Sequence, residues 1–324
     1  MVMPSSGPLN MGGTSSPVSV AQELGLSLTA TISMNQANVR TLAGVGGSGT
    51  SWGMNSLYGK SNAFSFTISS NQTNANLRTL AVNAGWNQSS KVVATISGGI
   101  FISSNGTGTA ALTVNGSFPG GIDLINNGTI AGMGGAGGIG AGIAAAGTAG
   151  AAGGLALSVS SAVSITNNGT IGGGGGGGGG GQAATVRFAS GGDRAFTDMR
   201  GGGGGGGQSG AAANSAGGAP GTAGSVLWIN SNAVAGGAGT SGGAGAGGAG
   251  SYSSNVPCNG GAGGGGGTRG AAGATGGVVT QSGAGLILAG TIVGPYSGGS
   301  AGGAVSGNAN ITWLAFGTRL GAIT

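Results

Sequence analysis

The chain has 324 residues, of which 86 are glycine, and it carries only nine basic and four acidic side chains for a net charge of +5. With no histidine and a single cysteine, Cys258, it has no residues for histidine-based triads, histidine metal sites, an internal disulfide or a cysteine-rich zinc site. The scattered Lys and Arg residues form no run that favours nucleic acid, and so few charges argue against a charged disordered tail. We therefore expect no enzyme, no cofactor, no metal and no nucleic-acid partner.

The only carboxylates near one another in the sequence are Asp193 and Asp198, which lie in a short segment between glycine runs. Paired carboxylates are the machinery of glycosidases. Two solvated loop residues are the simpler interpretation, so no catalytic residue is predicted.

The first 60 residues are predicted to form a small, mostly helical module. Ser16 and Pro17 are suited to cap and begin a helix that runs to Leu24 and stops at Gly25. A second helix is predicted over residues 35–43, with Gly44 ending it.

Residues 53–61 resemble a phosphate-binding loop, but five residues separate its glycines where four are needed. No strand precedes it either, so a short helix ending in a turn is the preferred interpretation.

The sequence predicts neither a secretory signal nor a membrane-spanning helix. Residues 1–8 hold no basic region and no continuous apolar stretch, so they do not resemble a secretory signal. Residues 131–157 are uncharged and contain G-x-x-x-G spacings typical of membrane helices, but glycine at this density makes a poor helix.

Alternating and β-branched segments predict a small β-rich domain over residues 61–120. The segments are 64–68, 92–96, 100–102 and 111–114. A short repeated motif occurs once in residues 1–60 and once in residues 61–120. Thr-Ile-Ser followed by Arg-Thr-Leu-Ala is found at 31–43 and again at 67–81. This repeated motif suggests a structural repeat.

From residue 121 onward a second repeat dominates. The sequence Leu-Ile-Asn-Asn-Gly-Thr-Ile at 124–130 recurs as Ile-Thr-Asn-Asn-Gly-Thr-Ile at 165–171, with looser copies at 227–234 and 286–292. Each copy is a short apolar strand that leads into a glycine-rich segment. Repeats of this kind stack their units to bury a shared face.

Glycine recurs with a period of three in the segments that follow these strands. One set is Gly261, Gly264, Gly267, Gly270, Gly273 and Gly276. A left-handed helix with three residues per turn explains this period, because every third residue then lies on the same face of the helix. Faces that touch neighbouring helices must then be glycine, whereas an outward face accepts Ala, Ser, Thr or Ile.

Such helices have no internal backbone hydrogen bonds, so their N–H and C=O groups must pair with neighbouring helices. We therefore predict a packed polyglycine-II lattice. A collagen-like triple helix is disfavoured, because only three prolines follow residue 120 and glycine runs such as 172–181 are uninterrupted. A largely flexible glycine-rich region is the other alternative.

The Asn-Asn-Gly-Thr-Ile-Gly-Gly run at 167–173, the glycine tracts 172–181 and 201–207, and the varied segments between them resemble the receptor-binding adhesins of bacteriophages. The resemblance covers roughly residues 121–324 and is strongest to the adhesins at the tips of T-even-like long tail fibres. It implies a sandwich of polyglycine helices whose distal loops touch a bacterial surface receptor. It also implies a protein of the virion tail that is made in the host cytoplasm.

Motifs in the first 60 residues resemble widespread phage tail proteins. They are Gly12-Gly13-Thr14, Val39-Arg40-Thr41-Leu42-Ala43-Gly44 and Met54-Asn55-Ser56-Leu57-Tyr58-Gly59-Lys60. The expected fold is thus mainly β and irregular, in three parts. Residues 1–60 form a virion-attachment module that contacts other tail proteins, 61–120 a β-rich domain, and 121–324 a polyglycine-helix domain with short apolar strands and receptor-facing loops.

Residues 182–200 are predicted to be the main receptor-facing loop, because they hold five of the thirteen charged residues and two of the seven phenylalanines. Arginine and aromatic side chains are enriched at binding hot spots. Residues 251–259 form a second predicted loop and 295–296 a third. The candidate receptor-binding residues are Arg187, Phe188, Asp193, Arg194, Phe196, Asp198, Arg200, Tyr252 and Tyr296.

Simpler interpretations remain beside these assignments. The phenylalanines of 182–200 would pack on the base of the loop and its charges would only be solvated. Trp228 and Trp313 lie in apolar, strand-like runs and are assigned to the core.

Two other functions are weighed against receptor binding. One is a structural tail-tip or baseplate component that leaves receptor binding to another protein. The other is an ice-binding polyglycine protein, which is less favoured because that class relies on flat regular faces and disulfides. The absence of heptads leaves both a monomer and a trimer open.

Overall fold

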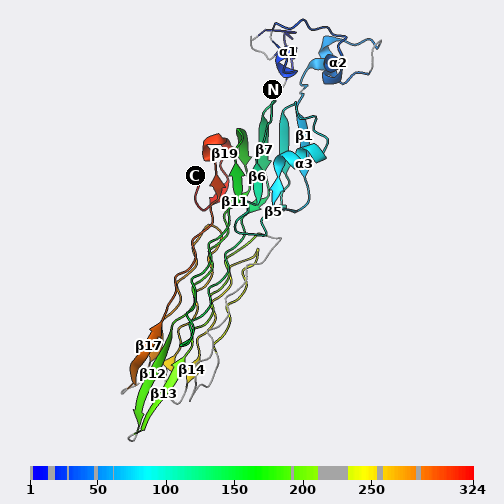
Figure 1. Ribbon diagram of the computed structural model, residues 1–324. Helices are drawn as coiled ribbons and strands as arrows, with labels where there is room; N and C mark the ends of the chain where they lie inside the picture. Colours follow the sequence, from blue (N-terminus) through cyan, green and yellow to red (C-terminus); the bar gives the residue numbers. More distant parts are fainter. Residues whose placement is uncertain are drawn as a thin grey trace.

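The structure is a computed structural model that describes residues 3–13, 19–27, 29–46, 50–60, 62–190, 193–210, 233–253, 258–281 and 286–324. The molecule is elongated, with the N-terminal module at one end, a β-rich body beside it and a long glycine-rich rod that ends in small sheets (Figure 1). As predicted, the described chain is mainly β with few helices. None of these helices is long and apolar enough to cross a bilayer.

The N-terminal module contains α1 (Val20–Glu23), α2 (Ala37–Ala43) and the 3-10 helix η1 (Met54–Leu57). Helix α1 begins at a capping box in which Ser19 and Gln22 exchange side-chain-to-backbone hydrogen bonds. The start predicted at Ser16 and Pro17 lies outside the described residues. Helix α2 ends as predicted at Gly44, whose φ of 71° is left-handed.

The body is a solenoid of three parallel sheets, because every turn of the chain gives one strand to each of the first two sheets and all turns but the last give one to the third. The first sheet contains β1 (Phe64–Ile68), β4 (Val92–Ile96), β7 (Ile122–Asn126), β10 (Val163–Asn167) and β19 (Ile311–Ala315). The second contains β2 (Gln72–Thr73), β5 (Phe101–Ser103), β8 (Thr129–Ala131), β11 (Thr170–Gly172) and β20 (Thr318–Leu320). The third contains β3 (Ala75–Asn76), β6 (Leu112–Val114), β9 (Leu157–Val159) and β18 (Val305–Ser306), and α3 (Leu77–Asn83) follows β3.

One hydrophobic core fills the solenoid. Strands β4, β7 and β10 alternate buried and half-buried residues, as expected when one face of a strand packs inward. Leu124 and Ile165 are fully buried, and Trp313 packs partly buried against the same core, as predicted. Trp228, the other tryptophan assigned to the core, lies outside the described residues.

The predicted domain boundary at residue 120 is wrong. Strand β4 pairs with β7 over five residues, from Val92 opposite Ile122 to Ile96 opposite Asn126. Residues on both sides of the boundary also share the one hydrophobic core. The sheet therefore continues through residue 120 without a break.

The stacking of the two Asn-Asn-Gly-Thr-Ile copies is confirmed. Leu124 lies opposite Ile165, and Ile130 lies opposite Ile171. The corner between the strands is held by buried asparagines, because Asn126 donates from Nδ2 to Asn167 Oδ1 at 2.8 Å.

Replacing Asn167 with alanine is expected to lower the free energy of unfolding by about 1–3 kcal/mol, because Asn126 and the Phe316 carbonyl each lose a partner. Asn168 is the matched control, since it donates to Asn127 from an exposed position. Asn168→Ala should change stability by less than about 0.5 kcal/mol. Equal shifts of the thermal midpoint in the two variants would contradict the stabilising role assigned to the buried hydrogen bond between Asn126 and Asn167.

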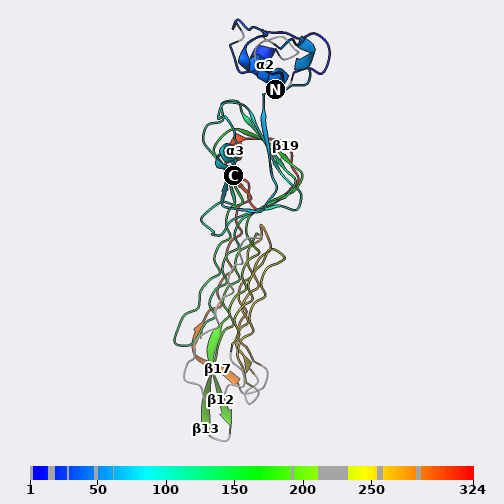
Figure 2. The same cartoon turned by 90° about the vertical axis from the view of Figure 1, so that its right-hand side faces the viewer.

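The rod is made of two insertions into the solenoid. The chain leaves after β8 and returns at β9, and it leaves again after β11 and returns at β18. The inserted segments run side by side away from the solenoid (Figure 2). Segments far apart in the sequence therefore become neighbours along the whole rod.

Backbone hydrogen bonds join these segments in steps of three residues. Gly132, Gly135 and Gly138 donate to the carbonyls of Gly172, Gly175 and Gly178 at 3.0, 2.8 and 2.7 Å. The glycine run 172–181 is the central segment of the rod. Its consecutive residues donate to three different neighbours, namely Gly174 to Gly154, Gly175 to Gln208 and Gly176 to Ala271. The same three residues accept from a further three, namely Gly302, Gly135 and Gly267.

Glycine is required along the central segment because neighbouring backbones lie against it on every side. A Cβ atom added at Gly174 would overlap the carbonyl oxygen of Met133, and one added at Gly177 would overlap that of Ala136. Replacing these glycines would force the segments apart.

Candidate functional site

The described residues of the segments that the sequence singled out at 182–200, 251–259 and 295–296 lie at the end of the rod farthest from the N-terminal module (Figure 1). Gln182 joins two parts of this end, because its Nε2 donates to the Gly294 carbonyl at 3.0 Å and its Oε1 accepts from Val279 N at 2.9 Å. Arg200 N donates to Ser251 Oγ at 2.8 Å. We call the described residues among 182–200, 251–259 and 278–296 the distal end.

The described residues of 182–200 form the two paired strands of a β-hairpin, and the prediction of a loop is wrong for them. Strands β12 (Ala183–Ser190) and β13 (Asp193–Met199) pair antiparallel. Strand β12 also pairs with β17 (Leu286–Val293), which contains the looser repeat at 286–292. That copy therefore belongs to the distal sheet and does not stack in the solenoid, while the copy at 227–234 lies mostly outside the described residues.

Five candidate residues lie in the outer half of the hairpin. The backbone register places Arg187 opposite Phe196, Phe188 opposite Ala195, Ala189 opposite Arg194 and Ser190 opposite Asp193. Their side chains lie outside the part that the structure describes. The strand pairing still brings the two arginines and two phenylalanines onto one short ribbon.

Asp198 does not fit the role of a receptor contact. Its side chain is only 8% exposed, and its Oδ1 accepts a hydrogen bond from Thr185 Oγ1 at 2.9 Å across the hairpin. Its position also argues against a catalytic pair, because Asp193 lies five residues along the same strand, or about 17 Å at 3.4 Å per residue. Glycosidase carboxylates are closer, at about 5–9.5 Å.

Arg200 and Tyr296 lie at the base of the distal end. Arg200 is half-buried, and its backbone exchanges hydrogen bonds with Ser251 through Arg200 N to Ser251 Oγ and Ser251 N to Arg200 O. Tyr296 is half-buried, and its backbone N donates to the Gly180 carbonyl at 3.0 Å. Tyr296 thus joins the distal end to the rod, whereas Arg200 joins two segments of the distal end to each other.

A small apolar core fixes the base of the hairpin. It contains Ala184, Val186, Met199, Cys258 and Val279. Burial raises the pKa of the Cys258 thiol to about 11, so the reactive thiolate is scarce at neutral pH.

Cys258 is therefore expected to resist a thiol reagent at pH 8 in the folded chain and to react at once after unfolding in denaturant. The raised pKa keeps the thiol protonated until the pH approaches 11, and the surrounding core blocks access. The measurement is the time course of labelling of the single cysteine. Rapid stoichiometric labelling of the native protein would show that this core is not formed.

A groove of about 610 Å³ lies beside the second small sheet of the distal end. This sheet consists of β14 (Tyr252–Ser253), β15 (Cys258–Asn259) and β16 (Thr280–Gln281). None of the described residues that line the groove is charged. Tyr252 is 44% exposed and Val278 56% exposed in its wall, so the Tyr252 side chain is accessible to a ligand.

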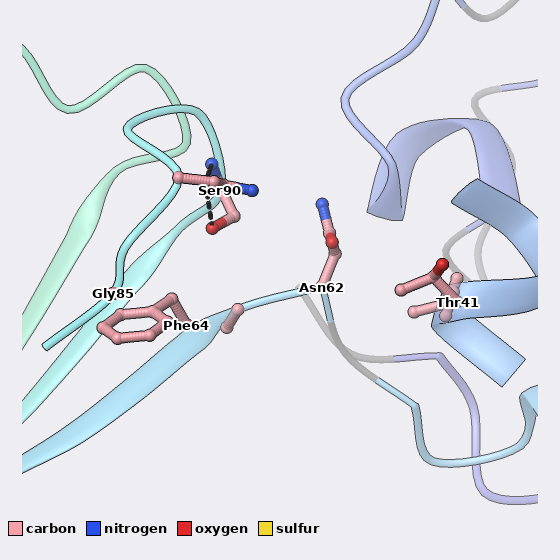
Figure 3. A pocket seen from close by; sticks show the side chains of 8 residues that line it. Thr41, Asn62, Phe64, Gly85 and Ser90 are labelled. Carbon is pink, nitrogen blue, oxygen red and sulfur yellow. Dashed lines mark hydrogen bonds between the residues drawn. The ribbon is translucent and has the colours of Figure 1, made fainter. Parts of the chain in front are cut away.

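A smaller pocket of about 230 Å³ lies between the N-terminal module and the solenoid (Figure 3). Thr41 lines it from α2, and Phe64 and Ser90 line it from the solenoid side. Glu23 Oε1 nearby accepts a hydrogen bond from Asn62 N at 2.7 Å. The pocket marks the junction of the two parts and brings no chemically reactive groups together.

No cluster that suits a metal ion was found among the described residues. Within them, no three His, Cys, Asp or Glu side chains lie close enough to hold one.

The sequence profile of the phage tail fibre adhesin Gp38 family matches residues 63–324. The chain therefore belongs to this family of phage tail fibre adhesins, which are components of the virion tail. This confirms the resemblance drawn from the glycine tracts and the Asn-Asn-Gly-Thr-Ile copies.

Among solved structures, the chain is similar to one in the crystal structure of the gp37-gp38 adhesin tip complex of the bacteriophage S16 long tail fiber. The two are 22% identical with a TM-score of 0.49, and the match covers 97% of this chain and 100% of the other. No curated protein sequence matches the chain.

Proposed function

We propose that the chain is a receptor-binding adhesin whose distal end recognises a receptor on the bacterial surface, and that residues 1–60 attach it to other phage tail proteins. One observation carries the proposal. The described parts of 182–200 and 251–259, which the sequence singled out for charged and aromatic residues, lie at the end of the rod farthest from the N-terminal module, in a member of a tail fibre adhesin family.

We further propose that the rod is a sandwich of polyglycine-II helices that acts as a rigid frame. The three-residue steps of its hydrogen bonds support this assignment, as do the six neighbours of the central segment. A flexible tract would not keep such a phase. A rigid scaffold holds recognition segments in a fixed geometry, as binding loops on other folds require.

The proposed contacts are Arg187, Phe188, Asp193, Arg194 and Phe196 of the hairpin, together with Tyr252. Arginine and aromatic side chains supply most hot-spot energy in interfaces. Arg200 and Tyr296 are assigned to support these residues from the base. Asp198 is left out because it is buried.

The test is adsorption in the presence of the purified full chain. The chain should bind susceptible cells and reduce adsorption of the phage that carries it, whereas the heat-unfolded chain and resistant cells serve as controls. If the folded chain neither binds the cells nor competes with the phage, the structural role without receptor contact is favoured instead.

A further inference from the structure

The second small sheet of the distal end presents three different side chains in one row. Tyr252 lies opposite Asn259, and Asn259 lies opposite Thr280, in the antiparallel register. Residues directly opposite one another share a face of the sheet, and neighbouring strands are about 4.8 Å apart. The row therefore places an aromatic ring, an amide and a hydroxyl side by side over about 10 Å.

Burial shows which way this face points. Ser253 and Cys258, on the other face, are 0% and 1% exposed, and Cys258 packs against Met199 and Val279. Tyr252, Asn259 and Thr280 are all exposed and all line the groove of about 610 Å³. The row is thus the floor of an accessible groove. The volume of this groove lies in the range of small-ligand sites.

The chemistry of the groove selects against charged ligands. Within the part of the chain that the structure describes, its lining combines the row with Ala249, Ala262 and Val278 and includes no Lys, Arg, Asp or Glu. A phosphate or carboxylate would be left without a partner of opposite charge. A neutral ligand with one apolar face and several hydroxyl groups fits every member of the row.

A pyranose ring has this combination. Its C–H face packs on an aromatic ring, and its hydroxyls both donate and accept hydrogen bonds, which an amide and a hydroxyl can complement. We propose that this groove binds a neutral oligosaccharide of the bacterial surface, with Tyr252 as the stacking platform and with Asn259 and Thr280 as hydrogen-bond partners. The proposal rests on the receptor-binding function and assigns a ligand class to one part of the distal end.

The experiment titrates the full chain with the neutral oligosaccharide fraction released from the envelope of susceptible cells and purified free of lipid and of charged species. Calorimetry measures affinity, and saturation-transfer NMR identifies the protons in contact. Tyr252→Ala should weaken binding by about tenfold or more, whereas Tyr252→Phe, which keeps the ring, should stay within about threefold. Leu314→Ala is the matched control, because Leu314 is an apolar residue 64% exposed on the solenoid, and it should leave the affinity unchanged.

Equal affinity of Tyr252→Ala and the unaltered chain would overturn the proposal, as would failure of the unaltered chain to bind the oligosaccharide. Treated cells separate this failure from failure of the adhesin function. If the chain binds cells, and periodate leaves that binding intact while protease abolishes it, the occupant is a protein; the sugar assignment then fails and the adhesin function stands. If the chain binds neither cells nor oligosaccharide, both proposals fail.

Discussion

Replacing Gly264 with alanine is expected to disrupt the packing of the rod, whereas the same change at the adjacent Gly265 should leave it intact. A Cβ atom added at Gly264 would overlap the carbonyl oxygen of Ala274, but the nearest atom to one added at Gly265 is the Gly245 carbonyl oxygen at 3.9 Å. Overpacking costs about 1–3 kcal/mol, and we expect the upper end of this range here, since no flexible side chain can move aside. Gly265→Ala should be neutral or stabilise by about 0.4–1 kcal/mol, because alanine restricts the unfolded chain.

The measurement is the thermal midpoint of the full chain, combined with the protease resistance of the rod. The pair differs only in which face of one segment carries the methyl group, so helix or strand propensity cannot explain a difference. Equal stability of the two variants would contradict the close approach of backbones described for the rod.

Replacing Arg187, Phe188, Arg194 and Phe196 together with alanine is expected to abolish adsorption to susceptible cells while the fold is retained. These residues lie in the outer half of the hairpin, beyond the core that fixes its base. Loss of four arginine and aromatic contacts at an interface removes several kcal/mol of binding energy, at about 1–2 kcal/mol or more for each hot-spot residue.

Phage that carry the quadruple variant should adsorb at the background level of resistant cells, and the purified variant should keep the thermal midpoint of the unaltered chain. Leu314→Ala, on the solenoid, is the control and should adsorb normally. Normal adsorption by a folded quadruple variant would remove the hairpin from the proposed binding surface.

The strongest sequence signals were the ones set by local repetition. The Asn-Asn-Gly-Thr-Ile copies stack in register because their asparagines pair at the corner and their isoleucines share the core. The copy at 286–292 has the Gly-Thr-Ile ending but lacks the two asparagines before it. Without the corner residues it pairs with β12 in the distal sheet.

The solenoid itself was hidden for physical reasons. Strands β2 and β3 have only two residues each, which is too short for a pattern of alternation. The second insertion also interrupts one turn of the solenoid. Strands β10 and β11 begin this turn before the insertion, and β18 completes it after the insertion. Local sequence carries no sign of a pairing at such separation.

The two copies of the Arg-Thr-Leu-Ala motif share a local conformation but not their surroundings. Both copies are helical, as Arg40 lies in α2 and Arg78 in α3, although a helix was predicted only for the first. Their surroundings differ, because Arg40 is 5% exposed and donates to the Gly46 carbonyl, whereas Arg78 lies over the Trp86 ring. A short motif thus predicts a local conformation better than it predicts packing.

The sequence singled out the candidate segment at residues 182–200 but not its conformation. Charge and aromatic content marked residues 182–200, but the hairpin depends on pairing with β17, whose residues lie far along the chain. The groove could not be predicted, because the row of Tyr252, Asn259 and Thr280 exists only when three separate strands come together.

The most direct test of the central claim is a hydrogen–deuterium exchange footprint of the full chain bound to outer-membrane vesicles from susceptible cells. Vesicles from resistant cells provide the baseline. Receptor binding at the distal end predicts new protection of backbone amides in β12–β13 and β14–β16, with no change in solenoid strands such as β4, β7 and β10. Protection confined to the solenoid or to the N-terminal module, with the distal strands unchanged, would contradict it.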